Sequence, residues 1–494
     1  MVSYFTPEFP KIDSTKYLPG TSYPIEETTM RRLIPMFCLC LCAQDSEPKR
    51  PKETLALLDE ARALPPEFCA DLLLKLAASP RIPGAKWKRE LIEEAFTTGA
   101  HAPLPYARKA YGQAVEARWT QEYWENDLEA LTLQARAAEA ILNLDPQRAA
   151  VLFNDIVLPT ITKEKCDEPA VANVDRYYEV AAKIFAKSFT PKQREKEEDL
   201  RFLEQRIAGM QSPAQVTPVL RMIFAVKAGP DALKRFLGAY AVALDRVNGG
   251  DRAYGTYEGM SVPAYSPEVA GAPMLLTAMR GYIARQVSGA RCSDHIVAGK
   301  LPLSVDRFNA LAARVDPAGG WLRPITADEA KPLKDDGTYG PQRPFASKRA
   351  WDALMALKWL DHGDTNPVRP WTAEERKSQE WNDHFNDTLK LIEGWKAEEE
   401  NSPEEYLINV AQVYAALAAK APAGAAKENV MGRFMNFLET HYAETANRNL
   451  WFTEFMHALM GRVRSSEEDR AWALEHCVRS RNPIIALYAK LEVR

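Results

Sequence analysis

The sequence predicts an all-α chain, built as an irregular α-solenoid of stacked antiparallel helical hairpins with two long loops. Two observations lead to this fold class. From residue 52 onward, apolar residues recur at spacings of three and four, the period of a helix that buries one face. Strand-like alternation bounded by turn residues is hard to find in the chain. The clearest helical segments are 128–142, 174–185, 233–244 and 406–417.

Capping residues mark where the predicted helices begin. At three starts a hydroxyl side chain caps the first free amides, proline takes the first helical position, and a Gln or Glu at the third position reaches back. These starts are Thr190-Pro191, Ser212-Pro213 and Ser402-Pro403. Further starts are Asp145-Pro146, Asn482-Pro483 and the capping boxes Thr372–Glu375 and Ser465–Glu468. Many of the 34 prolines therefore mark helix boundaries.

Residues 135–156 show how the helices are expected to pair. Small residues and a proline-marked turn give this segment a resemblance to the helical hairpins of tetratricopeptide or HEAT repeats, over about twenty residues. The resemblance implies two short helices folded back on each other. The capped starts follow no fixed period, so a regular array with about 34 residues per repeat is not predicted.

Two stretches lack helical periodicity, residues 248–267 and 316–345. The second holds five prolines and four glycines. We interpret 316–346 as a Pro/Gly-rich loop or linker, with a lid over a pocket as the alternative. It separates an amino-terminal helical-hairpin region, 44–315, from a carboxy-terminal helical region, 347–494.

The amino-terminal part contains the pattern of a secretory signal peptide. Met30 is followed by Arg31 and Arg32, then by the apolar run 33–43 and a polar exit. The run is too short to span a bilayer. We therefore predict a signal peptide at residues 30–43, here called the leader, and an exported protein, periplasmic or extracellular.

The position of the leader raises the question of the true start. Residues 1–29 carry four prolines and no helical periodicity, so we interpret them as an untranslated or disordered upstream stretch. Cleavage is expected near Cys42 or Ala43, and a lipid-anchored form beginning at Cys42 is the variant of this hypothesis. If Met1 is the true start, the apolar run is a buried segment and the protein is a cytosolic helical scaffold.

Removal of the leader leaves four of the seven cysteines. These four are widely spaced and form no C-x-x-C pair: Cys69, Cys166, Cys292 and Cys477. An even number in an exported chain permits two disulfides in three possible pairings. Four buried free thiols are the preferred interpretation, because cysteine packs as a small hydrophobic residue.

Composition and motifs exclude several chemistries. The 63 basic residues nearly balance 67 acidic ones, which argues against a nucleic-acid partner. The sequence contains no G-x-S-x-G, phosphate-binding glycine loop or H-E-x-x-H motif. No catalytic residue and no cofactor are predicted. The mixed charge run 192–199 predicts a solvated helix face.

The metal candidates are weak. Cys292, Asp294 and His295 place a thiol and an imidazole three positions apart, but a structural zinc site needs four ligands and no second pair is evident. Glu454 and His457 have the spacing found in di-iron helical bundles, which need that pair twice. No metal site is therefore predicted.

The function expected from these patterns is binding of a protein or peptide partner rather than catalysis. The alternative comes from residues 351–395, which hold five of the eleven tryptophans among many acids. Such a region suits an all-α enzyme or binding protein for glycans. Tryptophans gathered with acids in one pocket would favour the glycan function, and tryptophans dispersed through helix interfaces would favour the scaffold.

Overall fold

The computed structural model describes most of the chain from Arg50 onward. Contacts between Cα atoms divide the chain into residues 1–47 and 48–494, and all elements below lie in the second unit. The leader and residues 1–29 lie outside the described residues. The structure describes residues 50–103, 108–109, 127–161, 170–247, 249, 253–254, 272–289, 303–331, 347–362, 369–400, 403–422, 424–441 and 467–492.

The described residues confirm the all-α class. Their only strands are β1 (Arg108–Lys109) and β2 (Ala170–Val171), which form one short antiparallel pair. The helices up to residue 315 are α1 (Lys52–Arg62), α2 (Pro66–Ala78), α3 (Ala85–Gly99), α5 (Ala130–Leu142), α6 (Pro146–Asp155), α7 (Asp175–Lys187), α8 (Pro191–Glu195), α9 (Glu198–Ala208), α10 (Pro213–Ala225), α11 (Pro230–Arg246), α13 (Ala272–Ser288) and α14 (Leu303–Val315). The later helices are α15 (Lys348–His362), α16 (Gln379–Glu393), α17 (Pro403–Lys420), α18 (Ala425–His441), α20 (Glu467–Val478) and α21 (Pro483–Glu492), with short 3₁₀ turns η4 (Glu375–Lys377) and η5 (Ala397–Glu399).

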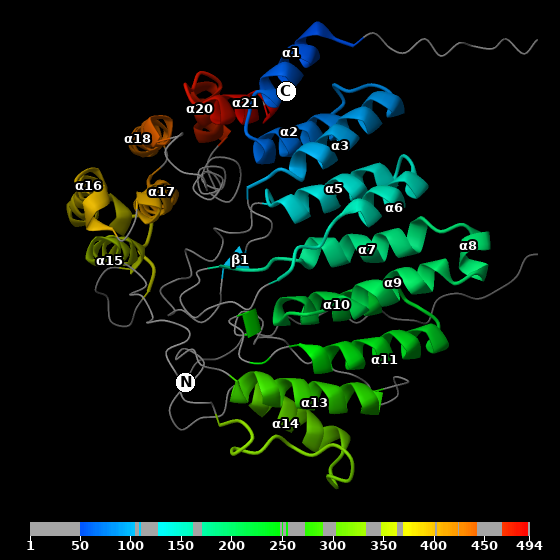
Figure 1. Cartoon of the computed structure of the whole chain (residues 1–494). Helices are drawn as coiled ribbons and strands as arrows, with labels where there is room; N and C mark the ends of the chain where they lie inside the picture. The colour runs from blue at the N-terminus through cyan, green and yellow to red at the C-terminus, as the bar shows by residue number, and fades with distance from the viewer. Residues whose placement is uncertain are drawn as a thin grey trace, which may run out of the picture. The chain divides into compact units, whose positions relative to one another are not determined.

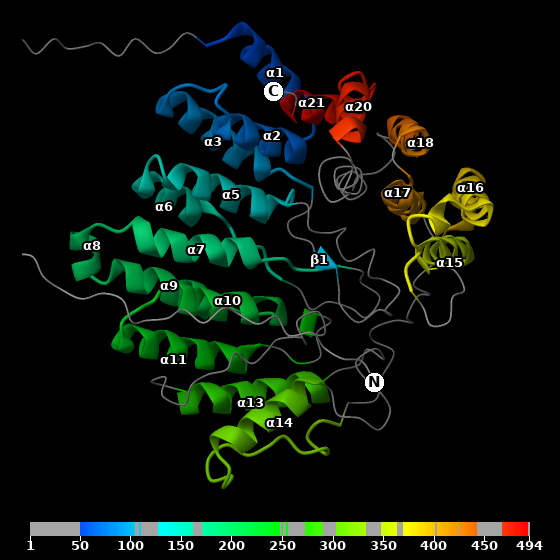
Figure 2. The same cartoon turned by 180° about the vertical axis from the view of Figure 1, so that it is seen from behind.

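Helices that are neighbours in sequence pack against each other. Helix α2 packs on α3, α5 packs on α6, and α10 packs on α11. Helices farther apart in the chain also pack: α5 with α7 and α7 with α10 in one layer, and α9 with α11 in a second. Figures 1 and 2 show the helices from α2 to α14 following one another in chain order.

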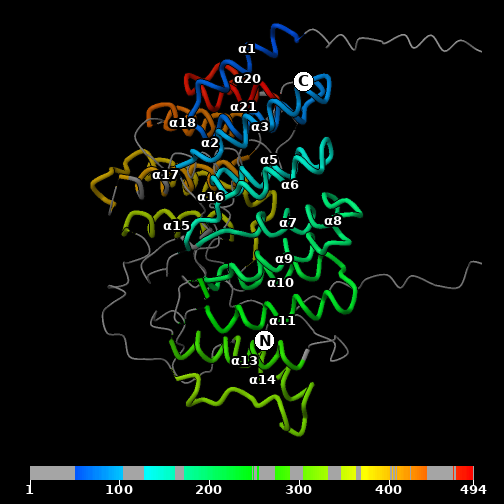
Figure 3. The backbone as a smooth tube through the Cα atoms, turned by 45° about the vertical axis from the view of Figure 1, so that its right-hand side comes forward, coloured from blue at the N-terminus to red at the C-terminus, as the bar shows by residue number. Residues whose placement is uncertain are grey.

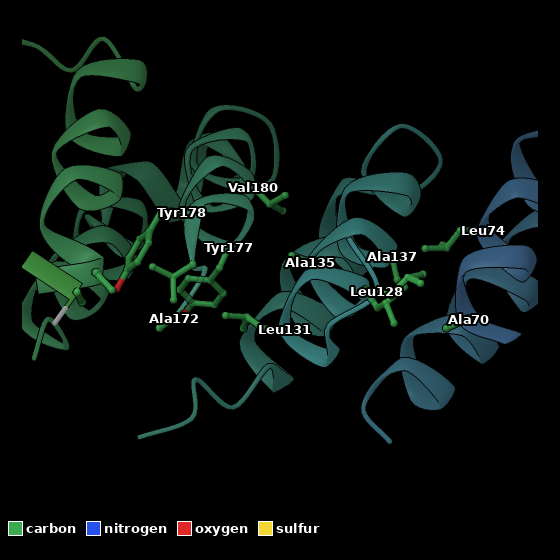
Figure 4. Close-up of a cluster of buried hydrophobic side chains, with 14 of the residues drawn as sticks. Ala70, Leu74, Leu128, Leu131, Ala135, Ala137, Ala172, Tyr177, Tyr178 and Val180 are labelled. Atoms are coloured by element: carbon green, nitrogen blue, oxygen red, sulfur yellow. The ribbon is translucent and has the colours of Figure 1, made fainter. Parts of the chain in front are cut away.

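The predicted apolar faces are buried where the structure describes them. On α5, Leu131, Ala135 and Leu142 are buried, and Tyr178 and Phe185 are buried on α7. Figure 4 shows alanine, leucine, valine and tyrosine side chains filling the space between α2, α5 and α7. Small residues let these helices approach closely, and the apolar area removed from water drives their association.

Four predicted helix starts are confirmed in atomic detail. The Asp145 side chain accepts a bond from the Arg148 amide at 3.0 Å, so α6 begins as expected. Both halves of the capping box are present where α8 begins at Thr190 and where α10 begins at Ser212. The Asn482 side chain caps α21 through the Ile484 amide at 3.0 Å. Ser402 and Ser465 lie outside the described residues.

The first half of the predicted linker is folded against the helices before it. The Asp316 carboxylate accepts bonds from the amides of Trp321 and Leu322 at 2.7 and 2.9 Å. Asn309 of α14 exchanges two hydrogen bonds with the backbone of Ile325. Arg280 of α13 binds the Glu329 carboxylate at 2.8 Å. Residues 316–331 therefore extend the α13–α14 packing, and residues 332–346 lie outside the described part.

The carboxy-terminal helices also pack in chain order. Helix α15 contacts α16 and α17, α17 contacts α18, and α18 contacts α20. The last helix, α21, contacts α20 and also α1 and α2 at the beginning of the unit. Figure 3 follows this chain trace from blue to red. Among the described helices, none combines the length and apolar character that a membrane span requires.

Candidate functional site

Two cavities open between stacked helices, and they form the candidate site. The first, the α6–α9 cavity, has a volume of about 370 Å³ and lies between α6, α9 and the turn that joins α7 to α8. The second, the α7–α10 groove, has a volume of about 430 Å³ and lies between two helices of the other layer. Both volumes fall in the range of ligand pockets in proteins.

Arg206 forms one end of the α6–α9 cavity. Its guanidinium lies 3.7 Å from the centre of the Phe202 ring and donates to the Phe202 carbonyl at 3.0 Å. It also donates to Oδ1 of Asn154 at 2.5 Å, which ties α9 to α6. Burial lowers the pKa of Arg206, but an arginine remains charged at neutral pH. The cavity therefore holds a fixed positive charge.

Other lining residues have groups without partners. Arg201 is exposed and makes no side-chain hydrogen bond or ion pair within the described part of the chain, and the same holds for Glu198. Ser188 is only 4% exposed, and its hydroxyl has no hydrogen-bond partner among the described residues. A buried hydroxyl without a partner is costly, so Ser188 marks a place where a ligand or water would be stabilised.

The α7–α10 groove has a different character. Its floor is apolar and includes Ala182, Pro218 and Met222. Pro218 lies inside α10, and its ring adds apolar surface to the groove lining. Acids at the start of α7 and lysines at its end line one wall, and Arg221 stands on the other wall with 68% of its side chain exposed. The groove thus combines an apolar base with a charged rim.

A buried cluster of charges lies elsewhere, around Asp71 of α2. Asp71 is 3% exposed and accepts from Arg136 of α5 at 2.6 Å, from Lys75 at 2.5 Å and from the Tyr488 hydroxyl of α21 at 2.6 Å. Burial alone would raise the pKa of Asp71, but the charges of Lys75 and Arg136 hold it well below its usual value. This Asp71 network joins three helices, and both carboxylate oxygens of Asp71 accept hydrogen bonds within it.

A second buried carboxyl, Glu129, precedes α5. It is 1% exposed, and burial raises its pKa to about 8, with a smaller contribution from the nearby Asp127 charge. A carboxyl with this pKa is largely protonated at neutral pH. Glu129 lines neither the α6–α9 cavity nor the α7–α10 groove. We therefore expect it to affect the stability of the fold and not the binding of a ligand at these two sites.

Four of the five tryptophans in region 351–395 serve helix packing. Trp381 and Trp395 are buried. The indole N–H groups of Trp371 and Trp381 donate to the carbonyls of Trp359 and Leu360, at 3.0 and 3.3 Å. The Trp395 indole donates to Glu400 at 2.9 Å. These polar edges are therefore occupied within the protein. Trp351, 44% exposed, stands apart from them.

The predicted metal candidates cannot be placed. Cys292, Asp294 and His295 lie outside the described residues, as do Glu454 and His457. Within the part of the chain that the structure describes, His, Cys, Asp and Glu side chains form no group of three or more that would hold a metal ion.

Two of the four cysteines that follow the leader are described, and both are buried free thiols. They are Cys69 and Cys477. Burial raises the pKa of Cys69 to about 11 and that of Cys477 to about 12, so neither is a ready nucleophile. Cys166 lies outside the described residues.

The sequence patterns did not indicate the α6–α9 cavity. Its lining comes from three segments whose proximity depends on the stacking of α6 on α9. The nearest sequence signal was the charge run 192–199, and this prediction was only partly right, because Asp199 is 5% exposed and pairs with Arg194 at 2.9 Å. Gln193 and Glu198 of the same run line the cavity. No family model, curated protein or solved structure matches the chain.

Proposed function

We propose that this chain is an irregular α-solenoid that binds a protein or peptide partner along its stacked helices. The observation that carries the proposal is the α7–α10 groove, whose apolar floor and charged rim are formed by two consecutive members of one helical layer. Stacked helical hairpins present extended surfaces of this kind to protein partners. Peptide grooves use an apolar base for affinity and rim charges for orientation.

Charge order along α7 gives the groove a direction. Asp175 and Glu179 lie in the first half of the helix, and Lys183 and Lys187 lie in the second half. Glu179 and Lys183 also pair with Arg176 and Glu139, so the dipole of a bound segment would act on charges that are partly satisfied. A bound helical segment with its amino end over the acids and its carboxyl end over the lysines would match both charges through its own dipole. The groove therefore favours an amphipathic segment that runs parallel to α7.

Site-specific photo-crosslinking tests this proposal in the cells that make the protein. A photoreactive phenylalanine analogue at Ala186, an exposed lining residue of the groove, should yield a crosslink to one defined partner protein that mass spectrometry identifies. The same analogue at Asp231, an exposed position of α11 outside both cavities, is the matched control. Equal products from both positions, or none from Ala186, would contradict the proposal.

Export is the second part of the proposal. It is supported by the leader sequence at residues 30–43, where a basic pair precedes an apolar run and a polar exit. Sequencing the amino terminus of the protein purified from its natural source should find a first residue near Gln44, or Cys42 in the lipid-anchored form. A protein that retains Met1 would rule out export by this leader and favour the cytosolic scaffold.

A further inference from the structure

The free groups of the α6–α9 cavity are mostly hydrogen-bond donors. Asn154 uses its side-chain oxygen to accept from Arg206, which leaves its NH₂ group. Gln193 uses its oxygen to accept from the amide and hydroxyl of Thr190 at 2.9 and 3.0 Å, which also leaves an NH₂ group. Arg201 adds a guanidinium without a partner among the described residues. A cavity with these donors requires a ligand rich in acceptors.

The net positive charge of the cavity indicates that the ligand is an anion. Arg201 and Arg206 supply two cations, and Glu198 is the one acid in the lining. A guanidinium binds a carboxylate with two parallel hydrogen bonds, which are stronger than those between neutral groups. The single acid disfavours a dianion such as phosphate by repulsion, whereas a monoanion fits the net charge. Phe189 and Val151 add apolar walls for a hydrocarbon chain.

Amide side chains on both walls indicate how the rest of the ligand is bound. Gln147 lies on α6 and Gln205 lies on α9, so donors face the cavity region from both helices. Peptide carbonyls on either side of one residue would accept from such donors. A carboxylate with a peptide group on each side is an internal acidic residue of a peptide rather than a free terminus.

We infer that the α6–α9 cavity binds a glutamate side chain of a partner peptide, with Arg201 as the residue that pairs with its carboxylate. Arg206 is a positioning residue, because its hydrogen bonds and its stacking on Phe202 fix the end of the cavity. The inference rests on the proposed peptide-binding function and assigns the chemistry of a second contact, on the layer that does not contain the α7–α10 groove.

A pair of small probes tests this inference on the full chain. N-acetylglutamate N-methylamide carries a carboxylate between two peptide groups, and N-acetylglutamine N-methylamide is its neutral isostere. Ligand-observed NMR titration should give a dissociation constant about tenfold lower for the glutamate probe, because a charge-assisted hydrogen bond is replaced by a neutral one. Inorganic phosphate serves as the third probe and should bind more weakly than the glutamate probe.

Three variants assign the preference to the cavity. Arg201→Gln should bring the two dissociation constants to within about twofold, and Glu198→Gln should strengthen binding of the glutamate probe by removing a like charge. Arg314→Gln removes an exposed arginine of α14, outside both the cavity and the groove, and should leave the preference unchanged. Far-ultraviolet circular dichroism of each variant verifies the helical fold, so a lost preference is not confused with unfolding.

Equal binding of both probes to the wild-type chain would overturn the inference. So would a preference that survives Arg201→Gln, a loss of preference in Arg314→Gln, or tighter binding of phosphate than of the glutamate probe. These outcomes are separate from those of the crosslinking experiment, which reads the α7–α10 groove. A crosslinked partner without a probe preference retains the proposed function and rejects this cavity as a glutamate site. A probe preference without a crosslink rejects the α7–α10 groove as the partner site and retains the glutamate preference of the α6–α9 cavity.

Discussion

The Asp71 network and the α6–α9 cavity both gather charged side chains between helices, but they use them differently. Both oxygens of Asp71 accept hydrogen bonds, from Arg136, Lys75 and Tyr488. In the cavity, Arg201 and Glu198 have no side-chain partners among the described residues, and donors outnumber acceptors. Charges that satisfy one another belong to the fold, whereas charges left open on a cavity wall are available to a ligand.

The sharpest way to test this comparison is Asp71→Asn. The change leaves the Arg136 cation buried without its anion, so we expect the free energy of unfolding to fall by about 3–5 kcal/mol. Urea denaturation followed by circular dichroism measures this. Asp352→Asn, on the exposed face of α15, is the matched control and should change the free energy by less than about 0.5 kcal/mol. If both variants lowered the free energy of unfolding equally, the Asp71 network would contribute no more to stability than an exposed charge on the surface.

The pH dependence of stability separates two of the buried carboxyls, Asp71 and Glu129. The pKa of Glu129 is raised from 4.5 to about 8 in the fold, so its contribution is fully present below pH 4.5 and is lost as the pH rises toward 8. The pKa of Asp71 is lowered from 3.8, so its contribution is present above that pH and is lost in stronger acid. Glu129→Gln should therefore flatten the fall in melting temperature between pH 4.5 and 8, measured by scanning calorimetry. An unchanged slope would contradict the role of Glu129.

A smaller effect should come from the spacing between α3 and α5, next to the network. A Cβ atom added at Gly99 would lie 2.9 Å from Cβ of Leu133 and 3.6 Å from Cβ of Ala70. We expect Gly99→Ala to destabilise the fold by about 1–3 kcal/mol, because the helices must move apart. Gly432→Ala in α18 meets nothing within 4 Å and should be neutral or slightly stabilising. Thermal unfolding of the two variants measures the contrast, and a shift of the same sign in both would contradict it.

The smallest expected effect on stability comes from a substitution in the α6–α9 cavity. Arg201 is exposed and unpaired within the described part, so Arg201→Gln should change the free energy of unfolding by less than about 0.5 kcal/mol. The same denaturation assay as for Asp71→Asn measures it. A loss comparable with that of Asp71→Asn would show that Arg201 serves the fold and not a ligand.

Local signals in the sequence predicted the helices well, because caps and periodicity act over a few residues. The start of α6 at Asp145-Pro146 and the buried face of α7 follow from chemistry within one or two turns. The candidate site could not be predicted in this way. Asn154 and Arg206 are 52 residues apart, and their contact exists only because α6 and α9 stack. Asp199 likewise appeared solvated in sequence, but tertiary packing buries it against Arg194.

The hydrogen bond between Tyr488 and Asp71 joins residues 417 positions apart. The ribosome synthesises the chain from its amino end. Helix α2 is therefore made long before Tyr488, whose hydroxyl donates the last hydrogen bond to the buried Asp71 carboxylate. Until then the carboxylate must remain hydrated or bonded only to Lys75 and Arg136. Helix α2 therefore gains its last buried hydrogen bond only after translation has ended. A chain that stops short of α21 would leave Asp71 without its tyrosine partner and would leave uncovered the faces of α1 and α2 that contact α21.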